Sequence, residues 1–169
     1  MRGTLFVIVM AVLSAAGCLL SGCGYSSKSL YPSGISTVYV EMFDNKTFWR
    51  GQEYDLTDAL CKMIEVRTPY RILSERDNAD SIMSGYISSV EKGTLVQEPR
   101  VGRPLEQQMR IVAVVSWKNR RTGEMILDRV EVMAAADFSQ FQGQSDSYAS
   151  SLAANRLAES IVDMMREKW

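Results

Sequence analysis

The residue pattern with the most definite chemistry is Leu20-Ser21-Gly22-Cys23, near the N-terminus. It follows one positive charge, Arg2, and an apolar run over residues 5–13, which is the organisation of a secretory signal peptide. The run is shorter than the roughly 20 apolar residues that span a bilayer. Cleavage before Cys23 would free an amine and a thiol for acylation. Because each buried CH₂ group contributes about 0.8 kcal/mol, acyl chains there would form a stable membrane anchor.

A bulky apolar residue lies three positions before Cys23, with Ser and Gly between them, and this pattern resembles the lipobox of bacterial lipoproteins. Cys18 is the rival site, but it follows Ala15-Ala16-Gly17 and lacks the bulky residue. The residue after Cys23 is Gly24 and not an aspartate. The resemblance to bacterial lipoproteins therefore implies a lipid-anchored protein on the periplasmic side of the outer membrane.

The chain of 169 residues divides into three parts on these grounds. We expect residues 1–22 to be the signal peptide and residues 23–36, which are small, polar and broken by Pro32 and Gly34, to be an acylated tether. Residues 37–169 are long enough to bury a substantial core, and we expect them to form a single α/β domain.

Histidine is absent from the chain, which narrows the available chemistry. Because histidine is the commonest general base and transition-metal ligand, we predict no enzyme, no metal centre and no cofactor. The 19 Lys and Arg residues nearly balance the 20 Asp and Glu residues, so the chain lacks the basic field that nucleic acid binding needs. With Cys18 removed and Cys23 acylated, Cys61 has no disulfide partner, and we expect it in the core.

Alternating apolar residues predict the strands of the domain. The pattern favours strands over 37–43, 108–117 and 125–138, and an extended segment over 70–90 that turns at Asp77-Asn78. Residues 118–123 are typical of a hairpin turn. Residues 91–105 contain two glycines and two prolines without apolar periodicity, so we expect a long connecting loop there.

Two amphipathic helices complete the predicted elements. The first begins at Asp55, with Asp58 in a capping-box-like position, and ends at Thr68-Pro69. The second is capped by Ser145 or Asp146. Their buried stripes are predicted to be Leu56, Ala59, Leu60, Met63 and Ile64 in the first, and Ala154, Leu157, Ala158, Ile161, Val162 and Met165 in the second.

The element order is therefore β-α-β-β-β-α. Each helix has one apolar stripe, so we predict a two-layer α/β sandwich in which both helices pack on one face of a mixed sheet of about four strands. The other face of that sheet is left open. Its aromatic and apolar residues then need a partner or a ligand.

Several short segments, in this order, resemble the lipopolysaccharide-assembly lipoprotein family, LptE. They are the start of the mature chain at 23–25, the strand end at 43–47, the helix start at 53–60, the segment 79–85 and the closing helix at 158–162. The resemblance implies a non-enzymatic protein that sits in the lumen of the LptD outer-membrane barrel. There it would act as a plug and assembly aid and would contact lipopolysaccharide on its way to the cell surface.

Lipopolysaccharide carries phosphates and carboxylates, so its contacts should be basic side chains, of which arginine can bind phosphate bidentately. The resemblance places such residues before the central hairpin, where Arg100 and Arg103 lie. Lys118, Arg120 and Arg121 form a second basic cluster. All five can equally be charges that keep loops soluble.

Three aromatic residues have two possible roles: Phe48, Trp49 and Trp117 are either anchors for a partner or ordinary core residues. The sequence also leaves a second function open. In that alternative, the protein is an outer-membrane lipoprotein that binds another ligand or an envelope-assembly complex through its open sheet face.

Overall fold

The computed structural model describes residues 30–166. The signal peptide, both candidate acylation sites Cys18 and Cys23, and the first part of the expected tether lie outside the described residues. The elements are β1 (Thr37–Val40), β2 (Asp44–Asn45), α2 (Gln52–Arg67), β3 (Arg71–Ile72), β4 (Ser81–Gln97), β5 (Pro104–Asn119), β6 (Met125–Phe138) and α3 (Asp146–Met164), with single 3₁₀ turns at Arg76–Asn78 and Gln140–Gln142.

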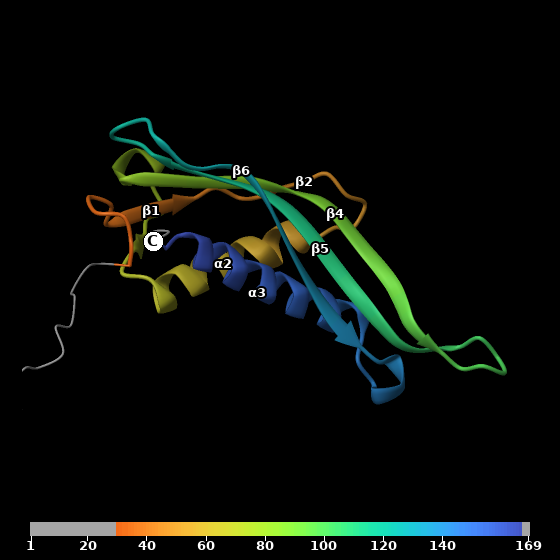
Figure 1. Cartoon of the computed structure of the whole chain (residues 1–169). Helices are drawn as coiled ribbons and strands as arrows, with labels where there is room; N and C mark the ends of the chain where they lie inside the picture. The colour runs from red at the N-terminus through yellow and green to blue at the C-terminus, as the bar shows by residue number, and fades with distance from the viewer. Residues whose placement is uncertain (1–29, 167–169) are drawn as a thin grey trace, which may run out of the picture.

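The molecule has two layers, with α2 and α3 side by side against one face of a mixed sheet (Figure 1). This confirms the predicted packing of two helices on a sheet. Within residues 30–166, no helix is both long enough and apolar enough to cross a membrane.

The sheet has six strands, so the prediction of about four was too low. Its order is β3-β1-β4-β5-β6, and β2 also pairs with β4. The pairs made by β1 and β2 are parallel, whereas β4, β5 and β6 form an antiparallel meander. The strands β2 and β3 have two residues each, too few for an alternation pattern to reveal.

The expected strand over 37–43 ends early, because β1 stops at Val40. The alternation then changes phase: Phe43 is buried while Met42 is 55% exposed. The ring of Phe43 lies against Gly85 of β4, where an added Cβ would come within 2.6 Å of the ring and 2.4 Å of the Val114 carbonyl oxygen. Gly85 is thus required by close packing and not by a turn.

The long loop predicted over 91–105 is wrong. β4 continues to Gln97 and β5 begins at Pro104, so only residues 98–103 connect them. Residues 91–97 are exposed on both faces, so the apolar alternation that predicts a half-buried strand is missing there. Figure 1 shows this hairpin arm extending beyond the helical layer.

The first helix also begins earlier than predicted, at Gln52 instead of Asp55. Gly51 precedes it with a left-handed backbone and provides no side-chain cap, so the predicted capping box is not formed. The second helix agrees with the prediction. The hydroxyl of Ser145 accepts a hydrogen bond from the Tyr148 backbone N–H, as an N-cap does.

The core lies between the helices and the inner face of the sheet. Alternate residues of β5, from Met109 to Trp117, are fully buried as predicted. Leu60 of α2 and Ile161 of α3 are also fully buried, and the other residues of the two predicted stripes are buried except Met63, which is half-buried. Cys61 differs from its prediction, since it is only half-buried beside that stripe.

Candidate lipid-contacting and partner-binding surfaces

The five basic residues expected to contact lipopolysaccharide lie at opposite ends of the sheet. Arg100 and Arg103 belong to the loop between β4 and β5, and Lys118, Arg120 and Arg121 lie at the turn between β5 and β6. Figure 1 shows these two connections at the two ends of the meander. The structure therefore separates the residues into two surfaces and does not gather them into one site.

At the β4–β5 loop, Arg100 is exposed and, within the described part of the chain, has no hydrogen bond or ion pair. Arg103 is also exposed, but it contacts its neighbours. Its Nη2 atom lies 3.5 Å from an oxygen of Glu98, and its guanidinium stacks 4.3 Å from the ring centre of Phe141. These contacts orient Arg103 at the tip and leave Arg100 available to an external anion.

At the β5–β6 turn, two of the three basic residues serve the fold. The Arg120 guanidinium donates to the carbonyl oxygens of Ala79 and Asp77, the former at 2.9 Å. Arg121 donates to the Gly34 carbonyl and forms an ion pair of 3.2 Å with Asp80. Because these contacts join the turn to the segments before β1 and β4, Arg120 and Arg121 are fixed in place. Lys118 is exposed beside them.

Asp80 is the centre of these contacts. One of its oxygens accepts the backbone N–H groups of Ser36 and Thr37, at 2.9 and 3.0 Å. The bond from Ser36, with help from Thr37 and Arg121, lowers the pKa of Asp80. Asp80 falls within the segment 79–85 that resembles LptE, but no spacing rule in the sequence marked it as a hub. Its role depends on contacts across more than 40 residues.

The open face of the sheet carries mixed apolar and charged groups. Tyr86, Val112 and Val114 are half-buried there, and Met133 is 66% exposed. The Lys46 ammonium lies 3.3 Å from the centre of the Tyr86 ring. The open face is thus partly apolar, as the sequence predicted, and no other element of the described residues covers it.

A hollow of about 420 Å³ lies on this face, bordered by Glu41, Asp44, Tyr86 and Arg129, among others. Arg129 has a left-handed backbone, with φ of 47°, at a register shift between β5 and β6. Its backbone N–H donates to the Ser116 hydroxyl. The alternation of apolar residues does not indicate this conformation, because a bulge depends on strand pairing.

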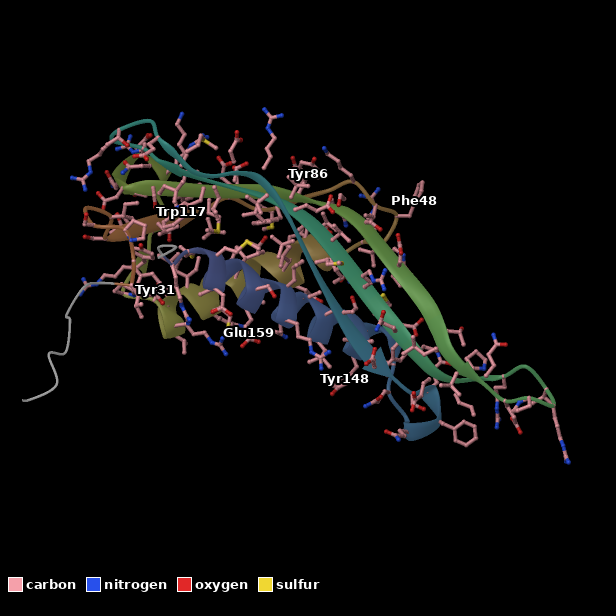
Figure 2. The ribbon with its side chains drawn as sticks, viewed as in Figure 1. Tyr31, Phe48, Tyr86, Trp117, Tyr148 and Glu159 are labelled. Carbon is pink, nitrogen blue, oxygen red and sulfur yellow. The ribbon has the colours of Figure 1, made fainter. Side chains whose placement is uncertain are left out.

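The three aromatic candidates differ in their exposure to solvent (Figure 2). Trp117 is fully buried and is therefore a core residue. Phe48 stands out from the loop between β2 and α2 and is 99% exposed. Trp49 beside it is 36% exposed.

Two further features of the described residues concern metal ligands and thiol chemistry. These residues contain no group of three or more Cys, Asp or Glu side chains placed to hold a metal. Burial, together with Asp58 and Glu65, raises the pKa of the Cys61 thiol, which disfavours the reactive thiolate.

Solved structures with the same fold come from several bacteria. Uncharacterized lipoprotein B from Nitrosomonas europaea is 12% identical, with a TM-score of 0.52, over 76% of this chain and 80% of that chain. A hypothetical protein from Chlamydia trachomatis is 10% identical, with a TM-score of 0.54, over 76% of this chain and 94% of that chain. At such identities the likeness shows the fold alone. No curated protein matches the sequence.

The fold defines a two-layer α/β domain built from two helices on one face of a mixed sheet. The family follows from the sequence itself. The profile of the lipopolysaccharide-assembly family, LptE, matches residues 35–167, and the chain belongs to this family. This match confirms the resemblance that the short segments indicated. LptE proteins are non-enzymatic assembly lipoproteins.

Proposed function

We propose that this protein is an outer-membrane lipoprotein, anchored through Cys23 on the periplasmic side, that partners an LptD-type barrel. It acts there as plug and assembly factor, and it has no enzymatic activity. The observation that carries this proposal is the LptE match over residues 35–167. The absence of histidine from the whole chain also supports a role in binding.

Within this function, we assign lipopolysaccharide contact first to Arg100 and Arg103. Both are exposed at the tip of the hairpin arm, and Arg100 has no competing partner among the described residues. Guanidinium groups suit the phosphates of lipopolysaccharide, because two parallel N–H groups can bind two phosphate oxygens. In the other cluster, Lys118 has no hydrogen bond or ion pair with any described residue, whereas Arg120 and Arg121 are engaged in the fold.

Affinity purification of the acylated protein from detergent-solubilised membranes tests the partnership. We expect one large barrel protein to be recovered in a ratio near one to one. A Cys23→Ala protein, which lacks the anchor, serves as the control for recovery through the membrane. Recovery of soluble periplasmic proteins without a barrel would refute the partnership.

The open sheet face favours a second candidate function. Tyr86, Val114 and Met133 present apolar surface beside the hollow bordered by Arg129. In this alternative, the lipoprotein binds another ligand or an envelope-assembly complex through that face. The purification distinguishes the two functions, since the alternative predicts no stoichiometric barrel.

A further inference from the structure

The strand β6 has an unpaired outer side. It is the last strand in the sheet order, and among residues 30–166 it pairs only with β5 (Figure 1). From Val130 to Phe138 its register against β5 runs without a bulge, and this stretch contains no lysine and no proline. Bulges, lysines and prolines are features by which proteins keep an exposed edge from pairing with another chain, so this edge is open to a further strand.

One hydrogen bond shows which backbone groups of β6 point away from β5. The Arg156 side chain of α3 donates to the Ala135 carbonyl oxygen at 2.7 Å. Because backbone groups alternate in direction along a strand, those of Glu131 and Met133 also face the free edge. Among the described residues, no other hydrogen bond reaches these outward groups.

The geometry of the edge limits what can cover it. A peptide strand satisfies the outward groups in order, because it presents donors and acceptors at the same spacing. A lipid surface offers no such ladder. The wall of a closed barrel has no free strand edge to supply one either. The edge therefore fits an open strand of another chain.

The side chains around Met133 make β6 complementary to itself. If two β6 strands pair antiparallel about a two-fold axis through Met133, then Glu131 lies opposite Ala135 of the second copy. In the same register Arg129 lies opposite Asp137 of the second copy, so opposite charges meet at both ends. Centring the pair on residue 134 would instead place Glu131 opposite Asp137, and these like charges disfavour that register.

We propose that β6 is a dimerisation edge, at which two copies of this chain join their sheets through antiparallel β6 strands centred on Met133. The inference goes beyond the barrel partnership and does not rest on it. Copies that are not held in a barrel form the dimer, and the pairing covers the edge that would otherwise recruit other chains.

Met133→Cys tests the register, in the acylated full-length chain that also carries Cys61→Ala, produced in excess of the barrel in intact cells. Hydrogen-bonded partners in an antiparallel pair have Cα atoms about 5.5 Å apart, a separation that a disulfide can bridge. We expect a disulfide-linked dimer on a non-reducing gel. Met42→Cys, at a methionine that is 55% exposed and lies outside β6, is the control and should stay monomeric. Absence of the dimer, or equal dimer from both positions, overturns the proposal.

Charge reversal tests the complementarity, with the Met133→Cys disulfide as the measurement. Asp137→Arg opposes Arg129 with a like charge at both ends and should lower the cross-linked fraction about threefold or more. Adding Arg129→Asp reverses both charges and should restore the dimer, which a general effect on folding would not do. Failure of the double reversal to restore it overturns the proposed register.

Two further variants test whether a backbone edge of this same chain is the contact. Ala135→Pro removes an outward N–H that β5 does not use, so it should abolish the dimer while the melting temperature stays near that of the parent. Dimerisation of Ala135→Pro equal to the parent overturns the proposal. So does p-benzoylphenylalanine at Met133 if, on irradiation, it captures a different protein in place of a second copy.

Discussion

Cys23 and the exposed arginines act through single functional groups, a thiol in one case and guanidinium ions in the other. Around Arg100 and Arg103 the surroundings are solvent and a few loop neighbours, so their removal should affect binding and not folding. Arg120 and Arg121 belong to the opposite class. Their donors satisfy backbone carbonyls, and their loss would disturb the segments that they join.

The first prediction concerns the anchor. Cys23→Ala should remove acylation and leave an unprocessed or soluble protein, because alanine offers no thiol for the diacylglyceryl group. Mass spectrometry of the purified protein measures the adduct, with Cys18→Ala as the matched control that should be processed normally. A diacylglyceryl adduct at Cys18 in the Cys23→Ala protein would show that the site is assigned to the wrong cysteine.

The second prediction concerns lipopolysaccharide. Replacing Arg100 and Arg103 together by Ala should weaken binding of purified lipopolysaccharide more than tenfold, since each charge-assisted hydrogen bond contributes about 1.5–3 kcal/mol. Glu at both positions should be worse than Ala because of repulsion. Added salt should weaken the wild-type interaction, because both guanidinium groups are exposed.

Lys62 and Arg71 supply the matched control for this experiment, because both are exposed and lie on α2 and β3, outside the hairpin arm. Their double alanine variant removes the same charge and should retain wild-type binding. The melting temperature of the Arg100/Arg103 variant should also stay near that of the wild type. If that variant binds lipopolysaccharide normally while the barrel complex forms, these arginines only keep the loop soluble.

At the scale of the elements, the two helices and the sheet bury the apolar surface of one another. The stripe of α3 meets the inner face of β5 and β6, α2 packs against β2, β3 and β4, and the two helices also contact one another. Buried Gln52 of α2 accepts a hydrogen bond from the Ser150 hydroxyl of α3, which satisfies two polar groups in the interface between the helices.

A third prediction belongs to this scale. Leu60→Asp or Ile161→Asp would place an unpaired charge at a fully buried position and should destabilise the protein by several kcal/mol, enough to unfold a domain of ordinary stability. Thermal melting followed by circular dichroism measures the effect. Asp at the exposed Val66 of α2 is the control and should melt near the wild type. Normal melting of both buried variants would contradict the two-layer packing.

In the whole molecule, the chain entering β1, the start of β4 and the β5–β6 turn converge on Asp80. Its carboxylate therefore couples three segments that are distant in the sequence. Because folding lowers the pKa of Asp80, its contribution to stability is present above the unfolded value of about 3.9 and is lost as the pH falls through the lower, folded value.

The fourth prediction follows from this coupling. Asp80→Asn should lower the free energy of unfolding by about 1–3 kcal/mol at pH 7, through weaker hydrogen bonds and loss of the ion pair with Arg121. Urea unfolding at pH 7 and pH 3 measures it, and the difference from wild type should shrink at pH 3. Asp128→Asn, at an exposed site, is the control. A difference that is equal at both pH values would contradict the role assigned to the charge.

Much of the architecture was predictable because it depends on local periodicity. The stripes of α2 and α3, the inward residues of β5, and the Ser145 cap each follow from spacing along one element. The family was recognisable for a related reason. Its short segments and their order can be identified in the sequence without knowledge of any tertiary contact.

Tertiary structure decided the features that depend on pairing between distant segments. The two-residue strands β2 and β3 form only because β4 and β1, respectively, pair with them. The hairpin arm continues to Gln97 because β5 pairs with it, although no apolar pattern predicts a strand there. The division of the basic residues into an exposed pair, Arg100 and Arg103, and a structural pair, Arg120 and Arg121, has the same origin. So does the full exposure of Phe48 against the full burial of Trp117. Burial and partners are properties of the packed chain, whereas residue type and spacing are properties of each segment.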